Sequence, residues 1–170
     1  AWPSEILAVT FTNRAAREMR HRMEVMIGDM AEGLPWLGTF HAVAARMLRR
    51  HAGLVGLNAN FTILDTDDQL RLMKQVIAEA GLDEKRWPAK QLASLIDRWK
   101  NRGERPGSVP HGESFSYGDG KGAALYARYQ ERLKSLNAAD FGDLLLHMLT
   151  IFAEHPDVLG EYRQRFKYIM

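Results

Sequence analysis

Two short polar turns carry the residues of this sequence that are best suited to contact a ligand. Each turn places a phenylalanine among hydroxyl, amide or imidazole side chains: Phe11, Thr12 and Asn13 in the first, and Thr39, Phe40 and His41 in the second. Hydroxyl and N–H groups suit phosphate oxygens, and an exposed ring suits stacking against a base. The two turns together indicate a nucleic-acid contact. For either turn alone, a helix cap beside a core aromatic is the favoured interpretation.

The elements around these turns follow from local composition. Residues 6–11 form an almost wholly apolar, β-branched run, which predicts a strand buried on both faces. Helix-forming residues begin at Ala15, with methionines at helical spacing. A second strand is expected within 34–37, and a second helix over 42–51 with Thr39 as its N-cap. In open α/β sheets, ligands bind at the carboxyl ends of strands, which is where both turns lie.

Composition excludes several classes of protein. The 170 residues contain no cysteine, which rules out disulfides and thiolate metal sites and favours an intracellular, cytoplasmic location. No apolar run reaches the ~20 residues of a membrane span, so no membrane partner is expected. No second metal ligand stands at a suitable spacing from His41, and the acids of 65–68 lack the glycine and glutamate of a calcium loop. No metal site is predicted. The net charge of +2 does not by itself demand a polyanionic partner.

A locally basic segment occupies the middle of the chain. After a short strand at 61–64 and a helix that starts at Asp65, a third helix follows Pro88. Seven lysines and arginines lie between Lys85 and Arg105, against only two acids. Such a face is usually only solvated, and a phosphate-facing surface is the alternative. The candidates for backbone contact are Lys90, Lys100 and Arg102.

The remaining segments are read more simply. Residues 105–122 predict a long exposed loop, whose glycines do not have the spacing of a phosphate loop. Helices are expected over 123–137 and 140–155, and a last short helix is expected to be capped by Asp157. Residues 166–170 return to strand character, as if a sheet continued beyond them. We therefore expect the sequence to be a piece of a longer protein.

Three motifs in order give a specific resemblance. Residues 6–22 resemble motif Ia of the superfamily 1 DNA helicases of the UvrD/Rep/PcrA group, and 38–41 with the following helix resemble motif Ib. Residues 137–146 resemble motif Ic, and 162–170 are similar to the strand that leads into the Walker B motif in that family.

The resemblance implies a fold and a division of the chain. The fold would be mainly α with a few short strands, a partial RecA-like α/β domain with a helical insertion. Residues 1–54 would belong to the RecA-like domain 1A, 55–137 would form the helical domain 1B, and 138–170 would return to domain 1A.

The resemblance also implies an activity for the parent protein. It would be an ATP-dependent 3′–5′ DNA helicase of DNA repair or replication that uses ATP and Mg²⁺ in the bacterial cytosol, associated with the nucleoid. This segment contains no Gly-Lys-Thr loop, and the Walker B acids would follow Met170, so we expect it to bind no cofactor and to be inactive alone. Its partners would be single-stranded DNA, single-strand/duplex junctions and the rest of the helicase chain, with self-association of the segment as a further expectation.

The resemblance assigns roles to individual residues. Phe11 would stack on a base, with Phe40 packed beneath or against the strand, and the two corners would lie side by side. The hydrogen-bonding and charged contacts would come from Thr12, Asn13, Arg14, Arg17, Thr39 and His41. No catalytic residue is expected in the segment. Two alternatives remain: the helicase part of a helicase-nuclease, and a non-catalytic helical module that binds DNA or protein.

Overall fold

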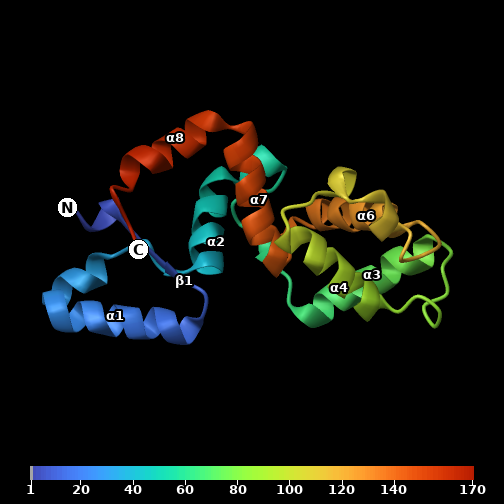
Figure 1. The fold of residues 1–170 in the computed structure, drawn as a ribbon, viewed down its shortest axis with the longest axis horizontal. Coiled ribbons are helices and arrows are strands. Elements are labelled where there is room, and N and C mark those ends of the chain that lie inside the picture. The colour runs from blue at the N-terminus through green and yellow to red at the C-terminus, as the bar shows by residue number, and fades with distance from the viewer. Residues whose placement is uncertain (1) are drawn as a thin grey trace. The chain divides into compact units, whose positions relative to one another are not determined.

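The computed structural model describes residues 2–170, which form two compact units (Figure 1). Unit 1 comprises the residues up to His51 together with Met148–Met170, and unit 2 comprises Ala52–His147. The units divide at 51 and 147, whereas the sequence placed the divisions at 54 and 137. The assignment of the units to domains 1A and 1B stays a prediction.

Unit 1 is built on a three-stranded parallel sheet in the order β2-β1-β5. The strands are β1 (Ile6–Thr10), β2 (Leu37–Thr39) and β5 (Tyr168–Ile169). Only Ala8 of β1 is buried, so the expectation of burial on both faces is wrong. Strand β1 is central in the sheet, because it pairs with β2 on one side and with β5 on the other.

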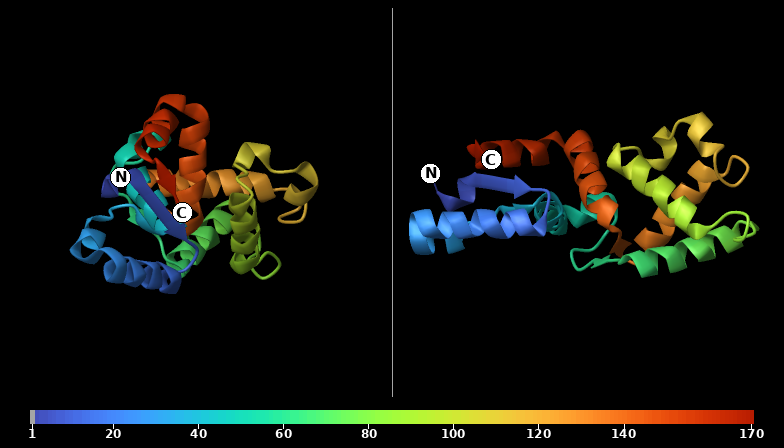
Figure 2. Two further views of the ribbon diagram at one scale, coloured as in Figure 1. Left: turned by 60° about the vertical axis from the view of Figure 1, so that its left-hand side comes forward. Right: turned by 60° about the horizontal axis from the view of Figure 1, so that its bottom comes forward.

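Helices cover both faces of this sheet in unit 1 (Figures 1 and 2). Helix α1 (Asn13–Ile27) packs Met19 and Met23 towards Ala8. Helices α2 (Phe40–His51) and α8 (Pro156–Arg165) lie on the other side, with the carboxyl-terminal part of α7 (Phe141–Glu154). Short 3₁₀ turns complete the unit at Pro3–Glu5 and Gly28–Gly33.

The caps explain where most of these helices begin. The Thr12 hydroxyl accepts a hydrogen bond from the Ala15 N–H at 3.1 Å, and the Thr39 hydroxyl accepts one from the Ala42 N–H at 3.1 Å. Both helices begin about two residues before the expected starts. Asp157 does not cap α8, because Pro156 takes the first helical position and His155 becomes the N-cap.

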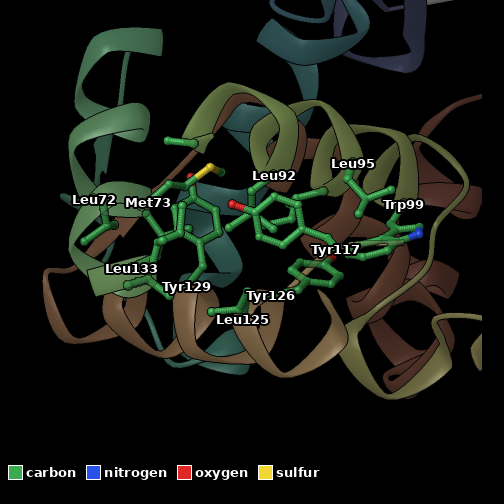
Figure 3. Packing of buried hydrophobic residues seen from close by; sticks show 14 of the residues in the cluster. Leu72, Met73, Leu92, Leu95, Trp99, Tyr117, Leu125, Tyr126, Tyr129 and Leu133 are labelled. Carbon is green, nitrogen blue, oxygen red and sulfur yellow. The ribbon is translucent and has the colours of Figure 1, made fainter. Parts of the chain in front are cut away.

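Unit 2 is a helical body with a single short pair of parallel strands. Its long helices are α3 (Thr66–Glu79), α4 (Ala89–Asn101) and α6 (Gly122–Ser135), after a 3₁₀ turn at Ala52–Val55. Strands β3 (Thr62–Ile63) and β4 (Ala138–Ala139) pair in parallel. The three helices enclose the aromatic core of Figure 3, which includes Trp99, Tyr117, Tyr126 and Tyr129. The expectation of a mainly α chain with a few short strands is confirmed.

The segment 105–122 is less loose than predicted. It contains a 3₁₀ turn at Pro106–Ser108 and the short helix α5 (His111–Ser114). Glu113 accepts a hydrogen bond from the Trp99 indole N–H at 2.9 Å, which ties the segment to the core. Within the described residues, no helix combines the length and the apolar character that crossing a membrane requires.

Candidate nucleic-acid interface

Phe11 and Phe40 form an exposed pair of rings at the carboxyl ends of adjacent strands. Thr10 and Thr39 are register partners in β1 and β2, so the next residue of each strand emerges at the same level. The two ring centroids lie 5.1 Å apart with the planes tilted by 40°. Phe11 is 86% exposed and Phe40 39% exposed. The expectation that the two corners lie side by side is confirmed. Both rings are exposed to water and are therefore available for stacking.

Polar groups surround the ring pair. Thr12 and Asn13 are exposed, and Asn13 opens α1, so the N–H groups of its first turn have no acceptor within the helix. A hydroxyl that accepts a hydrogen bond in a cap can still donate its own proton. Thr12 can therefore cap α1 and donate to a phosphate oxygen. Thr39 is only 9% exposed, so its hydroxyl serves the start of α2 first.

A groove of about 420 Å³ lies beside these residues, between α1 and β2. Its lining includes the predicted residues Asn13, Arg17 and Thr39. It also includes Arg20, which the sequence reading missed and whose guanidinium donates to the Leu37 carbonyl at 3.3 Å. Arg20 follows Arg17 by three residues, so helical spacing could have identified it. Arg14 is exposed in the first turn of α1, and His41 is half-buried in the first turn of α2.

Two of the three basic residues predicted in the helical segment are accessible in unit 2. Lys90 is exposed near the start of α4. Arg102, just after α4, forms ion pairs of 2.7 Å with Glu104 and with Glu113, and its side chain stays 42% exposed. The pKa of Glu113 is lowered by these hydrogen bonds, from Arg102 first and then from Trp99.

Lys100 cannot contact a DNA backbone, and its prediction is corrected here. Its side chain is 1% exposed, and its ammonium group lies 2.6 Å from Asp140 and 2.9 Å from Asp143. Tyr129 donates to Asp140 at 3.0 Å, and the Gln130 amide donates to Asp143 at 2.9 Å. The ion pairs therefore join α4 to the start of α7, and the two hydrogen bonds join α6 to it.

The same two aspartates of the motif Ic-like stretch cap α7. The Asp143 N–H donates to the Asp140 carboxylate at 2.8 Å, and the Asp140 N–H donates to the Asp143 carboxylate at 3.1 Å. Burial is the largest single influence on Asp143 and raises its pKa, but the charges of Lys100 and His147 and the hydrogen bonds from Lys100 and Gln130 together outweigh it, so the pKa of this carboxyl is lowered. Burial lowers the pKa of His147, whose ring lies 3.9 Å from Asp143. These carboxylates stabilise the fold of unit 2.

The structure thus brings the predicted residues of unit 1 together. In unit 2 it leaves Lys90 and Arg102 accessible but buries Lys100. Phe11 and Phe40 lie at the carboxyl ends of β1 and β2, and the groove lies beside them. Within residues 2–170, no group of three or more histidine, aspartate or glutamate side chains is arranged to hold a metal ion. The chemistry that unit 1 can offer is stacking, hydrogen bonding and positive charge.

Comparison with known proteins gives one consistent result. Residues 1–170 match the family described as the UvrD/REP helicase N-terminal domain. The chain is 41% identical over 171 residues to DNA helicase II of Escherichia coli K12, and 37% identical over 167 residues to the ATP-dependent DNA helicase PcrA of Staphylococcus aureus. These matches cover 99% and 98% of this chain and 23% of each relative. The chain thus spans about a quarter of the length of these relatives, and it belongs to the UvrD/REP helicase N-terminal domain family.

Proposed function

We propose that this chain is part of an ATP-dependent DNA helicase in which unit 1 supplies the surface that binds one unpaired DNA strand. The observation that carries the proposal is the exposed Phe11–Phe40 pair. The two rings lie side by side at the carboxyl ends of two parallel strands. The helicases named above, to which the chain is similar, support it. Unwinding would be powered by ATP and Mg²⁺ bound elsewhere in the complete polypeptide, with movement in the 3′–5′ direction in the bacterial cytosol.

The grip would not depend on base sequence. Every base has an aromatic face, so a base can stack on Phe11 whatever its identity. Thr12, Asn13 and the first-turn N–H groups of α1 would hydrogen-bond to phosphate or sugar, and Arg14 and Arg17 would add charge. Thr39 and His41 would support the second corner. A motor that must pass along any sequence needs contacts of this kind.

The helical unit would add contacts to duplex DNA near the junction. Lys90 is exposed, and Arg102 keeps accessible donors although it is paired with two glutamates. Their contribution would be electrostatic and therefore salt-dependent. Lys100 is excluded from this surface by its burial. The segment has no Gly-Lys-Thr loop to cradle phosphates, so we expect no ATP hydrolysis by the segment itself.

Loss of the stacking ring tests the proposal. Phe11→Ala should weaken binding of fluorescein-labelled oligothymidylate by about 1–3 kcal/mol, roughly 5- to 150-fold, because one base loses its platform. Fluorescence anisotropy measures this affinity. Phe115→Ala is the matched control, because Phe115 is 60% exposed but lies in unit 2. In the same assay, Lys90→Glu should weaken binding of a tailed duplex more than binding of the single strand.

Two results would contradict the proposal. Equal affinity of the wild type and Phe11→Ala would show that no base stacks on Phe11. Equal loss in Phe11→Ala and Phe115→Ala would show that any exposed ring contributes in the same way.

A further inference from the structure

Three arginines surround the indole ring of Trp36 in unit 1. The guanidinium carbons of Arg46, Arg50 and Arg165 lie 5.7, 5.0 and 5.9 Å from the ring centroid. Trp36 is 1% exposed, whereas all three arginines are exposed. The guanidinium groups therefore form an outer layer over a buried aromatic ring, and each contact is an attractive cation–π interaction.

No carboxylate of residues 2–170 forms an ion pair with any of these arginines. Glu161 precedes Arg165 by one turn of α8 but is not paired with it. Since the three cations share one ring, they lie within roughly a Debye length of one another, about 10 Å at 0.1 M salt. Their mutual repulsion is uncompensated, and a bound anion would relieve it.

These contacts leave the arginines able to bind a ligand. A cation–π contact uses the positive charge of a guanidinium group and none of its five N–H donors, which stay available for hydrogen bonds. The ring also restricts the rotamers of each arginine, so less conformational entropy is lost when a ligand binds. Forked N–H pairs of this kind match the oxygens of a phosphate group.

The cluster lies at the opposite end of the strands from the Phe11–Phe40 pair. Trp36 precedes β2 and Arg165 precedes β5, so both stand at the amino ends of the strands. The ring pair stands at the carboxyl ends. Helix α2 begins at Phe40 and carries Arg46 and Arg50 about 9 and 15 Å further along its axis.

We propose that Arg46, Arg50 and Arg165 form a second nucleic-acid contact, which holds the phosphate backbone of a strand that extends beyond the ring pair. The inference rests on the proposed function and deepens it, because it gives the same ligand a separate binding site on unit 1. The site reads no sequence, since its donors face phosphates rather than base edges. A strand of a few nucleotides would fill the ring pair alone, and only a longer strand would reach both contacts.

Binding measurements separate the two contacts. The chain is titrated with labelled oligothymidylates of about six and about twenty nucleotides at several salt concentrations. In the triple variant Arg46→Gln, Arg50→Gln, Arg165→Gln, the longer strand should bind at least tenfold more weakly. The slope of log K against log salt should fall by roughly 2, at about 0.7 per lost phosphate contact. The shorter strand should bind as before. Arg163→Gln, which removes a nearby positive charge from the same helix as Arg165, is the control and should bind both strands as the wild type does.

Arginine footprinting tests the wild-type chain without relying on the fold of the variant. The longer strand should slow modification of Arg46, Arg50 and Arg165 by an arginine-specific glyoxal, read by mass spectrometry, while Arg163 should react as before. Unchanged modification of the three arginines in the bound complex would overturn this inference and leave the proposed function standing. Protection by polyglutamate as strong as by DNA would overturn the assignment to nucleic acid. If neither oligonucleotide binds, the proposed function and this inference fail together.

Discussion

Lys100 shows which side-chain roles the sequence could predict and which it could not. It stands in a run of basic residues, and that context predicted a solvent-facing cation. Its partners Asp140 and Asp143 are 40 or more residues away, and no periodicity in α4 indicates them. Phe11 and Phe40 could be predicted because each lies where a strand-like apolar run gives way to a polar turn that starts a helix, which places it at the carboxyl end of a strand.

Removal of the Lys100 ammonium group should destabilise unit 2 strongly. Lys100→Met keeps the apolar stem but leaves two buried carboxylates without a cation, a loss of about 3–5 kcal/mol in the free energy of unfolding. Urea denaturation followed by circular dichroism measures this change. Lys90→Met, at an exposed position of the same helix, should stay within about 0.5 kcal/mol of the wild type. A Lys100→Met variant as stable as the wild type would show that the ion pairs contribute nothing net.

His147 should make the stability of unit 2 depend on pH. Its surroundings contain the charged groups Asp143, Asp140, Lys100 and Lys134, and burial is the main reason that its pKa is lowered. Below about pH 6.5 the unfolded chain takes up this proton before the folded chain does, so stability falls as pH drops from about 6.5 towards the folded pKa. Urea midpoints across this range should fall less in His147→Gln. An identical pH dependence in both proteins would remove His147 as the cause.

Helix starts were predictable to within about two residues because caps act within three residues. Asp65 accepts a hydrogen bond from the Asp68 N–H at 2.8 Å, as its place before α3 predicted. The errors arise where a more distant contact decides. Helix α5 lies in a glycine-rich segment of weak helix propensity, and Glu113 and Ser114 are held there by contacts with α4 and α6.

Two helical glycines should respond in opposite ways to the same substitution. At Gly122, the first residue of α6, an added Cβ would lie 2.8 Å from the Ser114 carbonyl oxygen, so Gly122→Ala should cost about 1–3 kcal/mol. At Gly160 in α8, an added Cβ would meet nothing within 4 Å, and Gly160→Ala should gain about 0.5–1 kcal/mol. Thermal unfolding measures both changes. Equal effects of one sign would show that the space around each Cβ does not decide the outcome.

Two hydrophobic clusters among the described residues differ in size. Fifteen buried residues form the cluster of unit 2, from Leu72 to Ala138, whereas the cluster of β1 and α1 contains Ala8, Leu34 and Leu37. Composition and periodicity predicted the mainly helical character but not the partition of α7, because one continuous helix supplies residues to both units. In β5 Tyr168 and Ile169 are 56% and 69% exposed at the edge of the sheet, and self-association through this edge stays a prediction.

The difference in local burial should give unequal protection from hydrogen exchange. Amide protons of α3, α4 and α6 should exchange more slowly than those of β1, because the three helices pack around the fifteen-residue cluster whereas only Ala8 of β1 is buried. Exchange measured by mass spectrometry on peptides from each element tests this order. Slower exchange in β1 than in the three helices would contradict it.

The pairing of Thr10 with Thr39 limits which insertions and deletions the chain can tolerate. Each strand residue advances the chain by about 3.3 Å and turns the next side chain to the opposite face. One residue added or removed within β2 would therefore shift Phe40 along the strand direction relative to Phe11 and turn its ring away from that of Phe11. Length changes should be tolerated at the exposed residues 28–30 that follow α1, whereas β1, β2 and the buried Leu34 and Trp36 just before β2 should keep their spacing.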